Sequence, residues 1–143
     1  MRLKLLFIIS VCFLLSSMGY SQVSDNFNDG DFTENPAWVG NAADWTVNSA
    51  LQLQSNNMVT NSTYFLSTAS TLATAAQWEF YTQITFNPSS ANYIDVYLTA
   101  SASDISLNTT TGYFVRIGNT DDEISLYRKN AGGAIVKIID GVN

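Results

Sequence analysis

The chain has 143 residues, with twelve acidic and six basic side chains, no histidine, one cysteine and a formal net charge of −6 at pH 7. The absence of histidine excludes the Ser-His-Asp and Cys-His nucleophile systems and the usual zinc and iron ligand sets. The acidity argues against nucleic acid or an anionic lipid surface as a partner, and it suits a soluble extracellular protein or a calcium binder.

The N-terminal segment has the pattern of a secretory signal. Arg2 and Lys4 precede an apolar run from Leu5 to Leu15, and Gly19 and Ser21 stand at the positions that a signal peptidase reads. The run is too short for a membrane span. We therefore expect this segment to be a signal peptide that is cleaved after Ser21, with a hydrophobic N-terminal strand as the weaker alternative.

The mature chain, residues 22–143, is expected to be one secreted domain. It is long enough to bury a core without the help of disulfides or a structural metal. The single cysteine, Cys12, leaves with residues 1–21, so neither a disulfide nor thiol chemistry is expected. Cys12 also lies inside the apolar run, which is the wrong position for a lipid anchor. We place the mature protein outside the cell or on its outer surface.

The composition of the mature chain favours strands over helices. It is rich in Thr, Ser, Asn, Tyr and Phe and poor in helix formers other than Ala. The only candidate for a helical turn is the stretch from Ser67 to Gln77, where a loop is equally favoured. We therefore predict an all-β fold of antiparallel strands.

An acidic turn opens the mature chain, in the sequence DNFNDGDF. Asp25, Asp29 and Asp31 bring oxygen ligands of the kind that calcium prefers, although their spacing is not that of an EF-hand loop. Calcium here would be structural, and no other cofactor is expected. The favoured alternative is a turn rich in Asp and Asn at the entrance to a strand.

A small hairpin is predicted next. If residues 48–50 form its loop, Val47 lies opposite Leu51 and Trp45 lies opposite Leu53, so that apolar side chains meet. Another short strand is predicted from Thr63 to Ser67.

A longer strand pair is predicted from Trp78 to Phe86 and from Ile94 to Ala100. A loop from Asn87 to Tyr93 would place Phe86 opposite Ile94 and so align two apolar faces. The predicted core face consists of Trp78, Phe80, Ile84, Phe86, Ile94, Val96 and Leu98. The reverse face carries Glu79, Tyr81, Gln83, Thr85, Asp95, Tyr97 and Thr99.

The clearest hairpin spans Gly112 to Lys129. A loop from Asn119 to Asp122 places Ile117 opposite Ile124 and pairs like with like, whereas a loop one residue longer would set Ile117 against Glu123. One face, with Val115, Ile117, Ile124 and Leu126, is predicted to join the core. The other, with Phe114, Arg116, Glu123, Ser125 and Tyr127, is predicted to face water or a ligand.

The last predicted strand runs from Ile135 to Ile139, after the turn at Gly132-Gly133. No partner strand follows it before Asn143, whereas an antiparallel sandwich closes its sheets with further strands. We therefore expect an incomplete domain, at the N-terminal end of a larger protein.

The sequence predicts binding rather than catalysis. No pair of carboxylates has the placement that glycan hydrolysis requires. The reverse faces of the two predicted strand pairs instead combine aromatic rings with planar polar groups, as sugar-binding surfaces do. The candidate ligand-binding residues are Tyr81, Gln83, Asp95, Tyr97, Arg116 and Tyr127. The alternative is an ordinary solvated sheet face, in which Arg116 forms a cross-strand ion pair with Glu123.

Three stretches resemble a known family: DNFNDGDF with a Trp a few residues later, QWEFYTQITFNPSSANYIDVYL, and GYFVRIGNTDDEISLYRK. They resemble the concanavalin A-like, laminin-G-like jelly-roll domain of large secreted bacterial surface proteins, some of which also carry a lamin-tail or a C-terminal secretion-sorting domain. The resemblance implies a two-sheet antiparallel sandwich and a role in surface display, adhesion or carbohydrate contact. It supplies no catalytic residue.

We therefore expect a non-enzymatic extracellular module for binding or adhesion, with a glycan or surface polymer as its partner. Two alternatives stay open at this point. One is an accessory domain of a secreted glycanase or nuclease whose catalytic part lies beyond Asn143, and the other is a structural spacer.

Overall fold

The computed structural model describes residues 23–72 and 76–142, and the predicted signal peptide therefore lies outside the described residues. Within these ranges the fold is all-β, as predicted, and every strand pair is antiparallel. The part described contains no α-helix, only a short 3-10 turn, η1 (Ala42–Asp44). In the described ranges, no helix has both the length and the apolar character that a membrane span requires. The jelly-roll sandwich stays a prediction.

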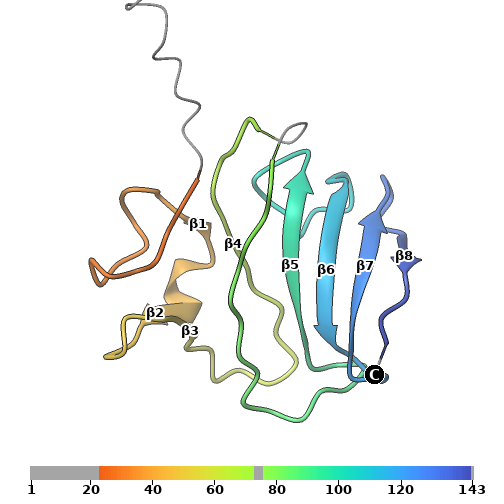
Figure 1. Cartoon of the computed structure of the whole chain (residues 1–143), viewed down its shortest axis with the longest axis horizontal. Coiled ribbons are helices and arrows are strands. Elements are labelled where there is room, and N and C mark those ends of the chain that lie inside the picture. Colours follow the sequence, from red (N-terminus) through yellow and green to blue (C-terminus); the bar gives the residue numbers. More distant parts are fainter. Residues whose placement is uncertain (1–22, 73–75, 143) are drawn as a thin grey trace, which may run out of the picture.

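The largest element is a four-stranded sheet with the order β5-β6-β7-β8, in which each strand pairs with its neighbour along the chain (Figure 1). Its strands are β5 (Tyr93–Ala100), β6 (Gly112–Gly118), β7 (Glu123–Lys129) and β8 (Ile135–Ile139).

The β6–β7 hairpin has the predicted register. Ile117 pairs with Ile124, and Phe114 pairs with Tyr127. Its loop begins at Asn119 and ends at Asp122, which have φ angles of 71° and 52°. Asn and Asp tolerate this left-handed conformation better than most residues. The local sequence therefore determines both the turn and the register.

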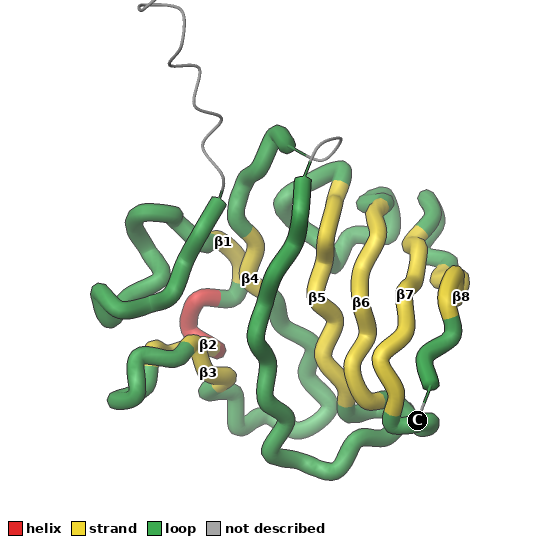
Figure 2. Tube along the Cα trace, viewed as in Figure 1, coloured by secondary structure: helices red, strands yellow, loops and turns green. Residues whose placement is uncertain are grey.

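The N-terminal half contains two short strand pairs. β1 (Val39–Gly40) pairs with β4 (Leu66–Ser67), and β2 (Trp45–Val47) pairs with β3 (Leu53–Ser55). Most of the chain around them is loop (Figure 2). Of the strand predicted from Thr63 to Ser67, only the last two residues pair. The possible helix from Ser67 to Gln77 is absent from the part that is described, which leaves out residues 73–75.

The register predicted for the small hairpin was wrong by two residues. Val47 pairs with Leu53, not with Leu51. The loop is longer because the Oδ1 atom of Asn48 accepts hydrogen bonds from the backbone N–H groups of Ala50 and Gln52. An Asn side chain that bonds nearby backbone in this way stabilises a turn.

The strand predicted from Trp78 to Phe86 is not formed in the described residues, and β5 pairs with β6 instead. Trp78 and Phe80, expected in the core, are 44% and 45% exposed, and Phe86 is exposed as well. The apolar pattern of β6 matches β5 equally well. β6 also places Arg116 opposite Asp95, which adds an ion pair that residues 78–86 could not provide.

The two faces of the four-stranded sheet are not divided into core and solvent as predicted, because the most buried side chains lie on the side predicted to face water. We call one the aromatic face, which carries Tyr93, Asp95, Tyr97, Phe114, Arg116, Ser125 and Tyr127. We call the other the aliphatic face, which carries Ile94, Val96, Val115, Ile117, Ile124 and Leu126.

Phe114 is fully buried and Tyr127 is 7% exposed, whereas Ile124 is 64% exposed. The expectation that the aliphatic side forms the core was therefore wrong at Ile124. The physical reason is that the rings of the aromatic face stack on one another and so exclude water between neighbouring strands.

Candidate binding site

The centre of the aromatic face is an ion pair between neighbouring strands. Arg116 on β6 lies opposite Asp95 on β5. Its Nε donates to Asp95 Oδ1 at 2.7 Å, and its Nη2 donates to Asp95 Oδ2 at 2.8 Å. The two side chains are 12% and 21% exposed. Such a two-bond contact fixes the planes of both groups and leaves part of each within reach of a ligand.

Aromatic rings hold this ion pair in place. The guanidinium carbon of Arg116 lies 3.7 Å from the ring centroid of Tyr93 and 5.2 Å from that of Tyr127. Phe114 is stacked between Tyr97 and Tyr127, with centroid distances of 4.9 Å and 5.4 Å. These contacts join three strands into one row of rings and restrict the movement of Arg116.

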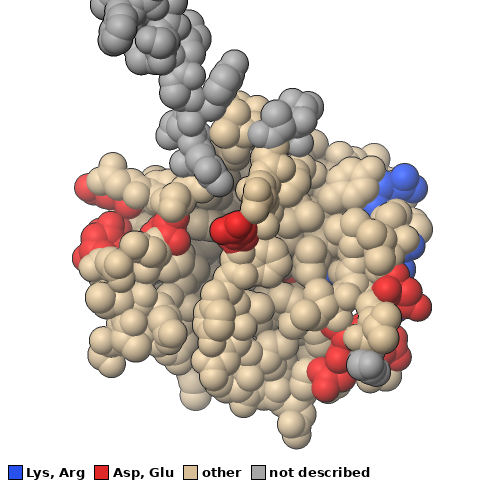
Figure 3. All heavy atoms as spheres, in the orientation of Figure 1, with Lys and Arg blue, Asp and Glu red and all other residues tan. Residues whose placement is uncertain are grey.

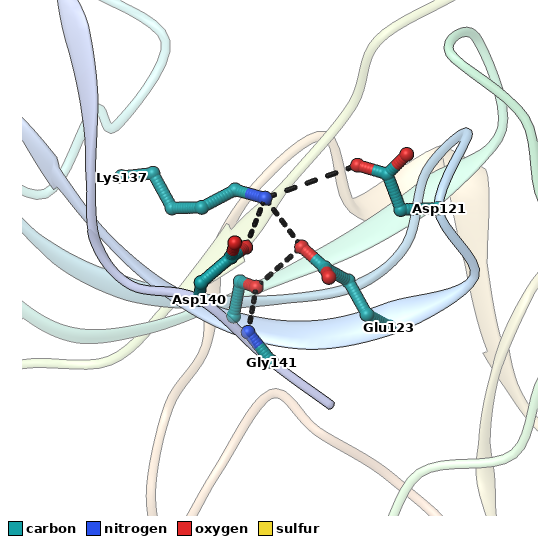
Figure 4. Close-up of polar contacts among 6 residues, drawn as sticks. Asp121, Glu123, Lys137, Asp140 and Gly141 are labelled. Atoms are coloured by element: carbon teal, nitrogen blue, oxygen red, sulfur yellow. Dashed lines mark hydrogen bonds and ion pairs between the residues drawn. The ribbon is translucent and has the colours of Figure 1, made fainter. Parts of the chain in front are cut away.

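A charged cluster borders the aromatic face near the hairpin tip (Figure 4). The Nζ atom of Lys137 on β8 donates to the carboxylates of Glu123 and Asp140, and it lies 3.8 Å from Asp121. The hydroxyl of Ser125 donates to Glu123, which ties this cluster to the sheet. Glu123 therefore pairs with Lys137 and not with Arg116, so the cross-strand pair suggested for Arg116 was wrong in its partner.

Three groups of this region, Arg116, Lys137 and Tyr97, have raised pKa values, so each keeps its proton at neutral pH. Burial alone would lower the pKa of Arg116, but the hydrogen bonds and the charge of Asp95 raise it above its usual value. The hydrogen bonds that Lys137 donates to Asp140 and Glu123 raise its pKa. Burial, followed by the charge of Asp95, raises the pKa of Tyr97. Arg116 and Lys137 therefore carry fixed positive charges on and beside this face.

The structure brings together four of the six predicted ligand-binding residues: Asp95, Tyr97, Arg116 and Tyr127. Tyr81 and Gln83 lie on the extended segment before β5, and Tyr81 is 80% exposed. Among the described residues, no hydrogen bond or ring contact joins these two to the other four.

Sequence reasoning missed Tyr93 and Lys137 as parts of the site, and it placed Phe114 on the correct face without naming it as a candidate. Tyr93 could have been found, because it lies two residues before Asp95 and so projects from the same side of β5. The contribution of Lys137 depends on how β8 pairs with β7. A register shift between Leu126 and Tyr127 sets this pairing, and no local pattern indicates it.

The acidic stretch DNFNDGDF forms the turn rich in Asp and Asn that was the alternative to a calcium site. Its Asp side chains accept hydrogen bonds from backbone N–H groups two or three residues further along the chain. Asp25 accepts from the backbone N–H of Phe27 at 2.8 Å and from the indole N–H of Trp38 at 2.8 Å. Asp29 accepts from the N–H of Asp31, and Asp31 accepts from the N–H of Thr33. Hydrogen bonds from backbone N–H groups also lower the pKa of Asp31.

Asp25 and Asp29 line one open hollow of about 490 Å³, but Asp31 is not among its lining residues. Acidic side chains cover this part of the surface and the region near the hairpin tip (Figure 3). In residues 23–72 and 76–142, no three acidic side chains converge as metal ligands would. The structure therefore adds no support to the predicted calcium site at Asp25, Asp29 and Asp31.

Comparison with known proteins identifies no relative: no protein-family model, no curated protein and no solved structure matches this chain.

Proposed function

We propose that the chain is a non-catalytic extracellular binding module that contacts carbohydrate through the aromatic face of its four-stranded sheet. One observation carries the proposal: Asp95 and Arg116 form a two-bond ion pair that is held among aromatic rings and is still partly exposed. The secretion signal and the jelly-roll sandwich expected from the sequence belong to the same proposal.

The chemistry of this face suits a sugar. Carbohydrates present hydroxyl groups, which planar polar groups bind, and apolar ring faces, which stack on aromatic side chains. Asp95 and Arg116 hold each other in a fixed geometry, and Tyr93 beside them is 38% exposed. Because these groups are already ordered, binding would lose little conformational entropy.

A glycan array, followed by affinity electrophoresis in gels that contain the selected polysaccharide, tests the proposal. We expect Tyr93→Ala to weaken retention about tenfold, which corresponds to the loss of roughly 1.4 kcal/mol. Tyr81→Ala is the matched control, because it removes a more exposed ring outside the cluster. We expect retention of this control to be unchanged.

Two outcomes would count against the proposal. If the protein shows an intact melting transition but is retained by no glycan, the binding function is wrong. If Tyr81→Ala loses as much retention as Tyr93→Ala, the contact surface extends to the segment before β5, as the sequence originally suggested.

Secretion is tested separately by N-terminal sequencing of the protein from the culture medium. Cleavage after Ser21 predicts a mature chain that begins at Gln22. Protein that stays inside the cell with residues 1–21 attached would contradict the proposed location.

A further inference from the structure

A second hollow lies at the other end of the four-stranded sheet from the hairpin tip. Its volume is about 390 Å³, and it forms where β5 ends, β6 begins and β7 ends. These three strand ends lie together at the top of the sheet in Figure 1. Its polar lining residues include Thr99, Ser101, Thr111, Arg128 and Asn130, and Tyr113 adds an aromatic ring.

The backbone at this end leaves room for the hollow. The β5–β6 register shifts between Tyr97 and Thr99, which is a bulge. Gly112 lies so close to the carbonyl of Thr99 that a Cβ atom at this position would collide with it. Bulges commonly redirect side chains beside binding sites, and a glycine permits such close approach of two backbones.

The lining of this hollow includes basic residues, although the chain as a whole is acidic. It contains Arg128 and Lys129 and no carboxylate. The ammonium group of Lys129 is already occupied, because it donates to the carbonyl oxygens of Ile105 and Leu107 at 2.7 Å and 2.9 Å.

Arg128 has no such partner. It is exposed, and among the basic side chains of the described residues it is the one without a hydrogen bond or ion pair to an acceptor. The basic atoms visible in Figure 3 lie at the same edge of the molecule as β7 and β8. The guanidinium group of Arg128 is therefore free to bind an anion.

Two hydroxyl groups add directed donors. The Oγ atom of Ser101 accepts from the N–H of Thr111 at 2.9 Å, and Oγ1 of Thr99 accepts from the N–H of Tyr113 at 3.3 Å. Each hydroxyl oxygen is thereby held in place while its own hydrogen stays available to a ligand. Tyr113, 44% exposed, lies directly opposite Arg128 in the β6–β7 register.

We propose that this hollow binds a carboxylate-bearing sugar, that is, a uronic acid unit of an acidic polysaccharide. Arg128 pairs with the carboxylate, Thr99 and Ser101 donate hydrogen bonds, and the ring of Tyr113 covers an apolar face of the sugar. The inference rests on the proposed carbohydrate-binding function, but it concerns a separate site on other residues and names the class of sugar.

The test is a titration of ¹⁵N-labelled protein with sodium glucuronate, followed by two-dimensional NMR. We expect the amide signals of Ser101, Thr111, Tyr113 and Arg128 to shift. Glucose and sodium acetate, tested in parallel, are each expected to bind at least tenfold more weakly, because one lacks the charge and the other lacks the ring. Arg128→Gln is expected to weaken glucuronate binding at least tenfold, and Arg128→Lys to weaken it less.

Each other outcome overturns the proposal. If glucose binds as tightly as glucuronate, or if Arg128→Gln has no effect, the charge is not recognised. If acetate binds as tightly as glucuronate, the site recognises a carboxylate but not a sugar.

Tyr93→Ala separates this proposal from the first one. If that variant abolishes glucuronate binding while Arg128→Gln does not, the site proposed here is wrong and the aromatic face is the sugar site. If Arg128→Gln loses glucuronate binding but no glycan depends on Tyr93, this site stands and the proposed role of the aromatic face fails.

Discussion

The two faces of the four-stranded sheet differ in how deeply their most central side chains are buried. On the aromatic face, the flat rings of Tyr97, Phe114 and Tyr127 stack across three strands and cover one another. On the aliphatic face, a branched side chain such as Ile124 has no flat surface to offer its neighbour and is 64% exposed. Stacked rings on neighbouring strands therefore cover each other's flat faces, which adds to the burial of Phe114, whereas Ile124 gains no such cover from its neighbours.

Removal of a ring from the middle of the stack tests this difference most strongly. Phe114→Ala is expected to lower the free energy of unfolding by about 3–5 kcal/mol, because the residue is fully buried and leaves a cavity. Ile124→Ala is the matched variant on the aliphatic face, with an expected loss below about 1 kcal/mol. Urea denaturation measures both. Similar losses in the two variants would show that the aliphatic face carries as much of the core.

The ion pair gives the next largest effect. Either Asp95→Asn or Arg116→Met alone is expected to cost about 2–3 kcal/mol, somewhat less than a fully buried pair, because it leaves one partly buried charge without its partner. The double variant removes both charges and should recover part of that loss. Thermal melts of the four proteins form a double-mutant cycle. Additive losses would indicate that the two side chains act independently.

Arg128 and Lys129 are adjacent in β7 and project to opposite faces of the sheet. Substitutions at these two positions therefore compare the two faces at one place. Lys129→Met removes the hydrogen bonds to the carbonyls of Ile105 and Leu107 and is expected to cost about 1–2 kcal/mol. Amide hydrogen exchange in the loop between β5 and β6 should become faster. Arg128→Met is expected to leave that loop unchanged. Faster exchange in both variants would contradict a specific role for Lys129.

The smallest effect is expected at the rim of the aromatic face, where the charges are exposed. Hydrogen bonds from Lys137 lower the pKa of Asp140 in the folded state. This contribution to stability is complete above the unfolded-state pKa of about 3.9 and is lost as the pH falls through the folded-state value. Lys137→Met should therefore lower the melting temperature slightly at pH 7, and the difference from the unaltered protein should shrink below about pH 4. A constant difference would rule out this linkage.

The sequence predicts those parts of the fold that depend on neighbours along the chain. The β6–β7 hairpin was predicted with its register because the turn residues Asn119 and Asp122 and the apolar alternation agree. The partner of β5 was not predicted, since residues 78–86 and 112–118 offer it similar apolar patterns. Contacts between distant residues, such as the ion pair between Asp95 and Arg116, select residues 112–118 as the partner of β5. The sequence of one segment alone does not indicate such contacts.

The site was predicted in part for the same reason. Asp95, Tyr97, Arg116 and Tyr127 were found by alternation along three strands, and the structure places them on one face. Their burial was not predicted, because hydrophobicity ranks Ile above Tyr and takes no account of ring stacking. The hollow around Arg128 was missed because its lining comes from three separate strand ends.

The division between the sheet and the N-terminal half has an optical consequence. All three tryptophans, Trp38, Trp45 and Trp78, precede the four-stranded sheet, whereas the stacked tyrosines Tyr97 and Tyr127 lie within it. Fluorescence excited at wavelengths that tryptophan alone absorbs therefore monitors the part of the chain before the sheet, whereas near-ultraviolet dichroism adds the stacked tyrosines of the sheet, so a difference between the two melts reports on the sheet. One unlabelled sample is enough to show whether the two halves unfold together.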